Sequence, residues 1–217
     1  MTRMTVSRRK LFATGACGLV GAVLGLPKNS ALESFQDRDA VFGVQILEPI
    51  STAHVSLNLL DTKGNPAFRP KAQNPHTIMR YEVLRQPRLR IFFSHPALGK
   101  RLIAALQGGD SHYTPCLGLA WTIAWFEGDS RAREADEILD DGAEVCSASP
   151  VRSEDVQGEI RWNADGVYQR VRMPAEMQPD RRVTRYESYI IDTTGKPIQA
   201  CLKAYWRLTD GTCFSAM

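Results

Sequence analysis

Apolar and small residues recur at spacings of three and four between Thr14 and Leu26, and this period predicts an amphipathic helix. Glycines fall on one side of this helix, and leucines and valines fall on the other. A glycine inside a helix costs about 1 kcal/mol relative to alanine, so several in one helix need a packing reason. We therefore expect the glycine side to lie against a closely approaching backbone, and Pro27 to end the helix. The glycines are Gly15, Gly18, Gly21 and Gly25.

The pattern then changes to the periods of β-strands. Residues 41–47 are almost continuously apolar, as in a buried strand, and residues 54–59 alternate strictly between polar and apolar. The segment 61–75 contains three prolines and several basic residues. Because proline interrupts the hydrogen bonding of a sheet interior, this segment predicts a loop or an extended hairpin.

Four more elements follow before the middle of the chain. Strands are expected at 78–85 and 88–94, separated by a proline, and an amphipathic helix at 96–107 that two glycines end. The apolar run 117–127 predicts a further strand. Helices that alternate with mostly antiparallel strands indicate an α+β sandwich of the ferredoxin-like or RNA-recognition type.

The second half of the chain is richer in strand patterns than in helix patterns. Residues 158–173, 183–191 and 198–208 each predict β-structure. We therefore expect a smaller β-rich part at the C-terminal end.

Charge changes the picture locally rather than overall. The 217 residues carry a net charge of +3, and their apolar and charged contents, 43% and 24%, are those of an ordinary globular protein. Between residues 69 and 101, however, eight basic residues face one acid, a local net charge of +7. Between residues 127 and 144, eight acids face two arginines, a local net charge of −6. The first region suits a polyanion and the second repels one.

Cysteine and histidine add no candidate metal or redox site. The five cysteines lie far apart without a C-x-x-C motif, and the four histidines are scattered. This spacing favours neither a zinc site nor a disulfide framework, and it fits a reducing, cytoplasmic compartment. No cofactor is therefore expected.

The segment 7–34 has a second interpretation, as a twin-arginine export signal. The adjacent Arg8 and Arg9 precede a mildly apolar stretch and then small residues. No good Ala-x-Ala cleavage motif follows, and the apolar stretch is too short and too glycine-rich to cross a bilayer. These residues alone leave an exported protein and a folded helix both open, and they predict no membrane anchor.

Four segments carry more specific motifs. Residues 74–84 read NPHTIMRYEVL, residues 87–92 read PRLRIF, residues 111–118 read SHYTPCLG and residues 18–25 read GLVGAVLG. Together they resemble the CRISPR-associated protein 5 family, the RAMP-fold subunit of type I Cascade, in particular its type I-B members. The resemblance extends to residues 173–182 and to the strand near the C-terminal end, so it covers nearly the whole chain.

The resemblance implies a ferredoxin-like, RRM-like RAMP domain over residues 1–127, with a basic β-hairpin thumb around 61–80. Residues 128–217 would then form an acidic linker and a smaller β-rich subdomain. Family members usually have a first β-strand well before the glycine-rich helix, whereas only a short segment precedes it here. Either the sequence as written starts too late, or this first strand is missing and leaves a sheet edge for a partner chain to cover.

What the resemblance implies for function is a non-catalytic role in RNA-guided DNA targeting. Such subunits bind the 5′ handle of the mature crRNA and cap the filament of repeated Cascade backbone subunits. They also contact the Cascade large subunit, which reads the PAM. The implied partners are therefore the crRNA 5′ handle, the backbone subunit and the large subunit, with target DNA bound only indirectly.

RNA handles are held through phosphate, 2′-hydroxyl and base contacts. In the implied thumb, Arg69 and Lys71 are candidate phosphate ligands, and Asn74 can present its amide to a base edge. Tyr81 can stack on a base, between the cationic Arg80 and Arg85. A further phosphate site is expected where the glycine-rich helix begins, because cations there oppose the helix dipole unless they share an anion with it. The residues of this site are Ser7, Arg8, Arg9 and Lys10.

Other roles stay open for several of these residues. Arg80 and Arg85 also fit a solvated strand, and Tyr81 also fits a core. The acidic run 127–144 should lie away from the RNA. The four tryptophans are expected in the core or in an interface rather than under bases, namely Trp121, Trp125, Trp162 and Trp206.

The enzyme alternative is a metal-independent endoribonuclease that processes the CRISPR repeat RNA, since one subtype of the family cleaves this RNA. Activation of a 2′-hydroxyl needs a base with a near-neutral pKa and a cation for the developing charge. His76, with Lys71 and Tyr81, supplies these residue types.

Overall fold

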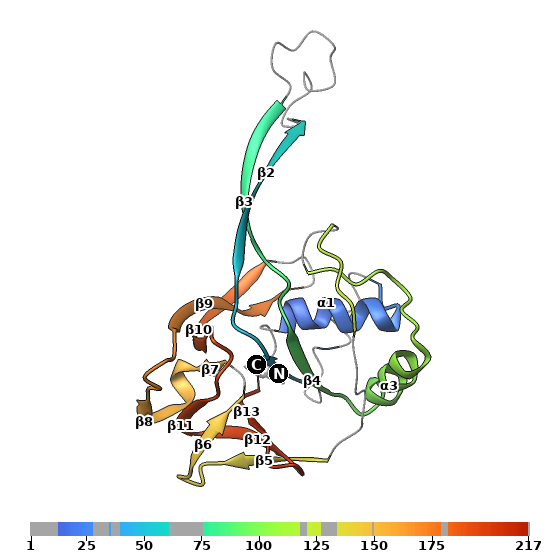
Figure 1. The fold of residues 1–217 in the computed structure, drawn as a ribbon. Coiled ribbons are helices and arrows are strands. Elements are labelled where there is room, and N and C mark those ends of the chain that lie inside the picture. The colour runs from blue at the N-terminus through green and yellow to red at the C-terminus, as the bar shows by residue number, and fades with distance from the viewer. Residues whose placement is uncertain are drawn as a thin grey trace, which may run out of the picture.

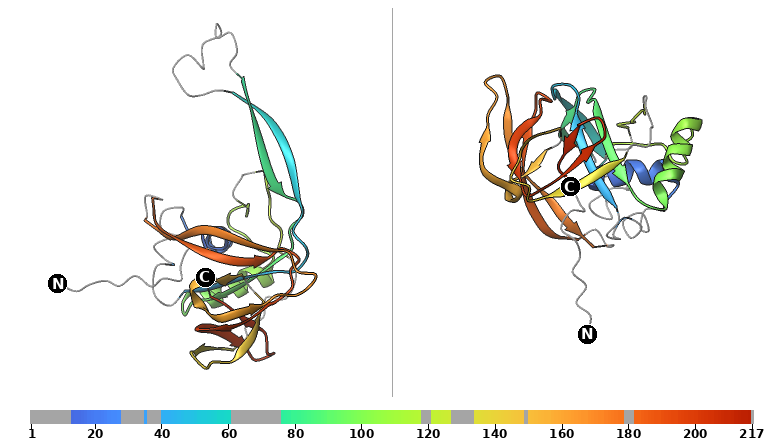
Figure 2. Two further views of the ribbon diagram at one scale, coloured as in Figure 1. Left: turned by 90° about the vertical axis from the view of Figure 1, so that its left-hand side faces the viewer. Right: turned by 90° about the horizontal axis from the view of Figure 1, so that it is seen from below.

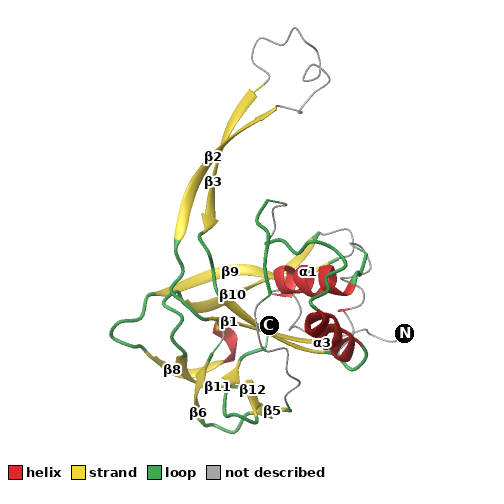
Figure 3. Ribbon diagram, turned by 45° about the vertical axis from the view of Figure 1, so that its right-hand side comes forward, coloured by secondary structure: helices red, strands yellow, loops and turns green. Residues whose placement is uncertain are grey.

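The computed structural model shows an α+β fold in which strands dominate (Figure 1). It describes residues 13–27, 35, 40–60, 76–117, 121–126, 134–148, 150–178 and 182–216. In this part of the chain, two α-helices and a two-stranded sheet form one half of the body, and a long β-hairpin projects from it (Figures 1 and 3). The remaining strands form the other half. The predicted order of helix, four strands and helix is confirmed.

Helix α1 (Ala13–Leu24) forms where the spacing of three and four predicts it. Gly25, with φ of 71°, follows the last turn. The expected glycine face is only partly present: Gly21 is buried, but Gly15 and Gly18 are exposed, and a Cβ on either would meet no described atom within 4 Å. The close approach is found at the C-terminal end of the helix, where a Cβ on Gly25 would lie 2.6 Å from the His112 ring, and the apolar face supplies the contacts with the core. Its buried residues are Ala16, Cys17, Leu19, Val20, Val23 and Leu24.

Strands β1 (Val41–Ile46) and β4 (Leu89–Ser94) pair antiparallel and share a hydrophobic core with α1. Alternation along β4 places Leu89, Ile91 and Phe93 against this core, as the pattern predicts. Among the described strands, β4 is hydrogen-bonded to β1 alone. The strand expected before α1 falls on residues outside the described ranges.

Helix α3 (Leu98–Gly108) covers the same core with Leu98 and Leu102. The backbone N–H groups of Ala97 and Leu98 both donate to Nδ1 of His95 at 3.1 Å, which satisfies two free donors at the helix start. Gly109, with φ of 70°, ends the helix. The pair of glycines thus stops the helix as predicted.

The strand predicted at 117–127 is wrong. The described residues of this region form an irregular loop, and their one ladder contact is an isolated bridge between Cys116 and Ile123. The loop is tied to the end of α1, where the Tyr113 N–H donates to the Ala22 carbonyl at 2.9 Å. An apolar run becomes a strand only where a sheet edge is available, and the described residues of this run bond within their own loop instead, Leu117 N–H to the Thr122 carbonyl and Ala124 N–H to the Pro115 carbonyl.

The C-terminal half contains two further sheets (Figure 2). One has the order β7-β10-β9 and the other the order β5-β12-β13-β6-β11-β8. β-Structure is present at each predicted position in this half, but the patterns at 158–173 and 198–208 each form two strands rather than one. The elements are β5 (Ala135–Leu139), β6 (Glu144–Ser147), β7 (Val151–Arg152), the 3₁₀ turn η2 (Ser153–Asp155), β8 (Val156–Arg161), β9 (Tyr168–Met177), β10 (Val183–Asp192), β11 (Ile198–Leu202), β12 (Ala204–Leu208) and β13 (Cys213–Phe214).

The two halves of the body pack directly against each other and are not separated by a linker. Tyr189 of β10 is 1% exposed and lies in the core that α1 covers. The rings of Phe92 and Phe214 stack with centroids 4.4 Å apart. Gly43 leaves room for this stack, because a Cβ there would lie 2.5 Å from the Phe214 ring. The segment expected as an acidic linker also contains β5 and β6, so its described part belongs to a sheet.

A buried charged cluster connects β10 to the η2 turn. The Glu187 side chain is 2% exposed and accepts hydrogen bonds from Arg152, at 3.1 and 3.2 Å, and from Arg185. Arg152 also donates to both carboxylate oxygens of Asp155, at 2.6 and 2.9 Å. Burial lowers the pKa of Arg152, but its bonds and charge interactions with Asp155 and Glu187 more than offset this and hold the pKa above its ordinary value. The cluster is therefore charged and paired.

Candidate nucleic-acid interface

The projecting hairpin consists of β2 (Thr52–Leu60) and β3 (His76–Leu84). The strands pair antiparallel without a break, from Thr52 opposite Leu84 to Leu60 opposite His76. The hairpin extends well beyond the rest of the molecule (Figures 1 and 3). A two-stranded hairpin is only marginally stable alone in water, so an element of this length suits a binding partner.

One face of the hairpin is mainly polar. Side chains alternate between the two faces, and the register puts Ser56 opposite Arg80 and His54 opposite Glu82. Asn58 lies on the same face, opposite Ile78. Arg80 is exposed, and Ile78 is 71% exposed. This face combines a cation with hydroxyl, amide and imidazole groups, which is the donor set for phosphate and sugar contacts.

The opposite face of the hairpin is apolar. Val55 lies across from Tyr81, and Leu57 lies across from Met79. The Tyr81 hydroxyl donates to the Met79 sulfur at 3.6 Å, along the strand rather than outward. Met79 is 45% exposed because no part of the described body covers this face. Such an exposed apolar face suits a protein neighbour better than an RNA backbone.

The structure therefore separates two residues that the sequence placed together. Arg80 is on the polar face, whereas Tyr81 is half-buried on the apolar face. A base stacked on Tyr81 would therefore lie on the face opposite Arg80, because consecutive strand residues point to opposite sides.

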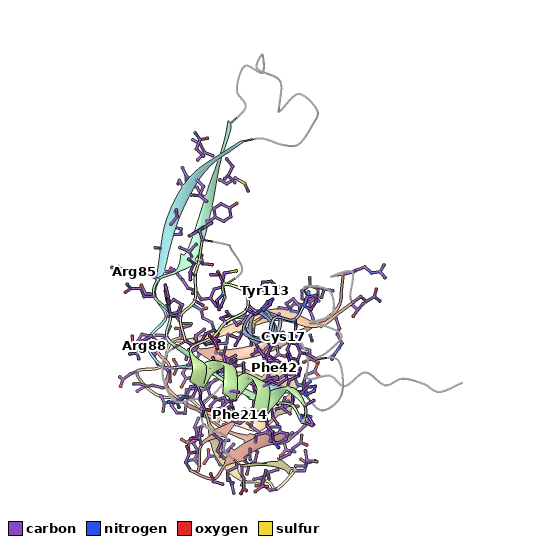
Figure 4. All side chains as sticks on the ribbon, turned by 90° about the vertical axis from the view of Figure 1, so that its right-hand side faces the viewer. Cys17, Phe42, Arg85, Arg88, Tyr113 and Phe214 are labelled. Carbon is purple, nitrogen blue, oxygen red and sulfur yellow. The ribbon has the colours of Figure 1, made fainter. Side chains whose placement is uncertain are left out.

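Arg85 lies at the base of the hairpin, directly after β3. Its N–H donates to the Ser51 carbonyl at 2.8 Å, and its side chain is exposed (Figure 4). Arg88, just beyond, forms an ion pair with Glu48 at 2.8 Å. Arg85 is thus better suited than Arg88 to contact an added phosphate.

The remaining predicted RNA contacts lie outside the described residues. The phosphate site before α1 and the tip of the thumb are both among them, as is the side chain of the predicted general base His76. The geometry therefore bears on neither the helix-start phosphate site nor the nuclease alternative. The predicted contact residues concerned are Ser7, Arg8, Arg9, Lys10, Arg69, Lys71 and Asn74.

The acidic run was expected to lie away from the RNA, and its described part lies far from the projecting hairpin. Its described part falls on β5, on β6 and on the connection between them, at the opposite end of the body from the hairpin (Figure 1). The negative charge is therefore separated from the polar face of the hairpin. A polyanion on that face is not repelled by a neighbouring acidic strand.

Three of the four tryptophans are exposed, so of the two expected locations, core or interface, the core does not apply to them. Trp121 and Trp125 are 49% and 85% exposed, in the loop that follows Tyr113, and Trp162 is 58% exposed. These three indoles are not core residues of the chain. A fold buries only the large apolar residues that its other elements cover, and no described element covers this loop. Exposed apolar groups of this kind suit an interface, the other expected location.

The described residues show neither a metal centre nor a bilayer-spanning helix. No three histidine, cysteine or acidic side chains among them are grouped so that they could bind a metal ion. None of the helices formed by these residues is both long and apolar enough to cross a bilayer.

Sequence reasoning missed one basic group in the second half. Arg170 and Arg172 are two residues apart in a predicted strand, so they had to share a face, and both are exposed. Their spacing could have shown from the sequence alone that they form one basic group. The partner residue on the same face, Tyr186, comes from β10 and could be identified only from the strand register.

The resemblance to a CRISPR-associated family has no independent support from comparisons with known proteins. The chain matches no family model, and no curated protein is similar to it at a significant level.

Proposed function

We propose that this chain is a non-catalytic RNA-binding subunit of a type I CRISPR Cascade complex, which binds the 5′ handle of crRNA and caps the backbone filament. The hairpin β2–β3 is the observation that carries this proposal. It projects between β1 and β4, at the point where the resemblance implies a thumb, and its polar face carries the exposed Arg80. The order α1, β1, hairpin, β4, α3 supports a ferredoxin-like RAMP domain for this half.

The two faces of the hairpin suggest how it would bind. On the polar face, the Arg80 guanidinium would neutralise a phosphate, and Ser56 and Asn58 would bond to sugar hydroxyls or base edges. The apolar face, with Leu57 and Met79, would pack against the adjacent backbone subunit. RNA would thus be held between the hairpin and a neighbouring protein chain.

The exposed loop after Tyr113 supports a second protein contact. Trp121, Trp125 and Phe126 are between 43% and 85% exposed, and the loop is fixed to the end of α1. Aromatic side chains of this kind are enriched at interfaces, because each buries a large apolar area at little cost in conformational entropy. We propose that this surface faces the large subunit of a cytoplasmic ribonucleoprotein complex that binds target DNA only indirectly.

The test is binding of labelled handle RNA by the purified chain, measured by fluorescence anisotropy against a shuffled RNA of equal length. Arg80→Gln should weaken binding and reduce the slope of log K against log salt by about 0.7, the value for one phosphate contact to a single strand. Glu82→Gln is the matched control on the same face, and it should bind at least as tightly as the wild type. Equal affinity for handle and shuffled RNA would overturn the proposal.

The same preparation addresses the enzyme alternative. Repeat RNA incubated with the protein in EDTA should remain intact. A single site-specific cut, lost in His76→Ala, would show a metal-independent nuclease instead.

A further inference from the structure

The outer face of the β9–β10 hairpin carries a basic and aromatic group that the proposed function does not use. In the antiparallel register, Tyr186 lies opposite Pro174, Ser188 opposite Arg172, and Ile190 opposite Arg170. Because side chains alternate, Arg170, Arg172, Tyr186 and Ser188 share one face. We call these four residues the outer patch.

The other face of the same two strands is committed to the interior. Tyr189 and Met173 pack into the core that α1 covers, and Glu187 accepts bonds from Arg152 and Arg185 in the buried cluster. On the outer face, Tyr168 and Ile190 pack against the second core, so the exposed part of that face consists of Arg170, Arg172 and Tyr186, with the half-buried Ser188. The outer patch is therefore presented by a rigid element and not by a loop.

The arginines of the outer patch differ from three other arginines of this half. Arg152, Arg161 and Arg185 each form an ion pair with a carboxylate. Arg170 and Arg172 are exposed and form no ion pair with a described carboxylate. The nearest carboxylate along β10, that of Glu187, points to the opposite face and is already bonded to two arginines. No described carboxylate therefore compensates these two positive charges.

Tyr186 gives the patch a second kind of contact. Its ring is 48% exposed, and the Arg172 guanidinium lies 5.0 Å from the ring centroid. A guanidinium beside an exposed ring can bind a phosphate while the ring stacks on the attached base. Ser188, next to them, adds a hydroxyl. Bases in a duplex are already stacked on each other, so this combination suits a single strand.

The patch lies on a sheet that starts at the root of the projecting hairpin. The Ile50 N–H, just before β2, donates to the Thr193 carbonyl just after β10, at 2.7 Å. The Thr193 N–H in turn donates to the Val167 carbonyl, just before β9, at 2.9 Å. At about 3.3 Å per residue along β9, Arg172 lies roughly 15–20 Å from this junction. A single strand held by the hairpin could continue onto the patch.

We propose that the outer patch of β9 and β10 is a second binding site for single-stranded RNA, which uses phosphate contacts to Arg170 and Arg172 and base stacking on Tyr186. This site shares its ligand class with the proposed function but rests on different residues. It would bind RNA without regard to sequence, because guanidinium and stacking contacts do not read base edges.

Binding of labelled oligouridine to the full chain, measured over a series of salt concentrations, tests this site. Arg170→Ala/Arg172→Ala should weaken binding and reduce the slope of log K against log salt by about 1.4, the value for two contacts. Lys100→Ala/Arg101→Ala removes the same charge from the exposed side of α3 and should keep the wild-type slope. Tyr186→Ala should lose about fivefold or more in affinity, and Tyr186→Phe should keep most of it.

The outcomes separate this inference from the proposed function. If the double arginine variant keeps the wild-type affinity and slope, the outer patch is not an RNA site, whatever the hairpin does. If the double variant loses oligouridine binding while Arg80→Gln leaves handle binding unchanged, the patch is supported and the hairpin proposal fails. Photo-crosslinking of 4-thiouridine RNA gives an independent readout, since the inference expects an adduct on the peptide that contains Tyr186. An adduct on the hairpin alone would overturn it.

Discussion

Arg152 provides the sharpest test of the packing beneath the outer patch. Its guanidinium makes four contacts of 2.6–3.2 Å with Asp155 and Glu187, and its side chain is 13% exposed. Arg152→Met keeps much of the side-chain volume but removes the charge. Among the described residues, Glu187 is then left with Arg185 as its remaining cation, and Asp155 loses its bidentate partner.

The expected loss follows from burial. Breaking a buried pair by removing one partner costs about 3–5 kcal/mol, because the other charge stays desolvated. Arg185 still compensates Glu187, and Asp155 is 13% exposed, so the lower end applies, about 3 kcal/mol. Arg161→Met is the matched control: its pair with Glu144 is as short, 2.6 Å, but the arginine is 71% exposed. Solvent screens this pair, and the expected loss is below about 1 kcal/mol.

Urea unfolding followed by circular dichroism measures both variants. With an m value of about 2–3 kcal/mol per M urea, Arg152→Met should lower the midpoint by about 1 M or more. Arg161→Met should shift it by less than half as much. A free energy of unfolding for Arg152→Met within about 1 kcal/mol of the wild type would refute the view that this cluster fixes β10.

Three further predictions concern other parts of the molecule. The Tyr205 hydroxyl donates to Asp141 at 2.6 Å, and this hydrogen bond lowers the pKa of the Asp141 carboxyl. The bond therefore stabilises the folded protein at pH values above the ordinary aspartate pKa of about 3.9. This stabilisation is lost as the pH falls through the lowered pKa. Urea midpoints of the wild type and Asp141→Asn should therefore differ at pH 7 and converge in acid, and a constant difference would contradict this linkage. Gly43→Ala places a Cβ 2.5 Å from the Phe214 ring and should cost about 1–3 kcal/mol in urea unfolding, so an unchanged midpoint would argue against the stack on Phe92. Trp125→Ala should change stability by less than about 0.5 kcal/mol, because the indole is 85% exposed, whereas a core tryptophan would cost about 3–5 kcal/mol.

Most secondary-structure elements were predictable because their signals are local. The period of α1, the strict alternation of β2 and the glycine stop after α3 each depend on a few adjacent residues. The region 117–127 shows the limit of this approach. Its apolar composition is that of a strand, but whether a strand forms depends on a partner edge, which no local pattern contains.

The candidate site was predictable in part. A basic region followed by a hairpin strand was evident, and Arg80 and Arg85 are exposed there. That Arg80 and Tyr81 face opposite ways was implicit in the predicted strand, since consecutive residues alternate. The polar and apolar faces of the hairpin, in contrast, depend on the register of β2 against β3.

The sequence by itself determined the α+β class, the order of most elements and the separation of basic from acidic regions, because these follow from short-range periodicity and charge. Only the tertiary structure decided which apolar residues are covered, with Tyr189 in the core and Trp125 in solvent. It also decided that Arg172 meets Tyr186 on one face. Burial and register depend on contacts between residues far apart in the chain. The same local sequence pattern is compatible with many different sets of such contacts, so the pattern alone does not select among them.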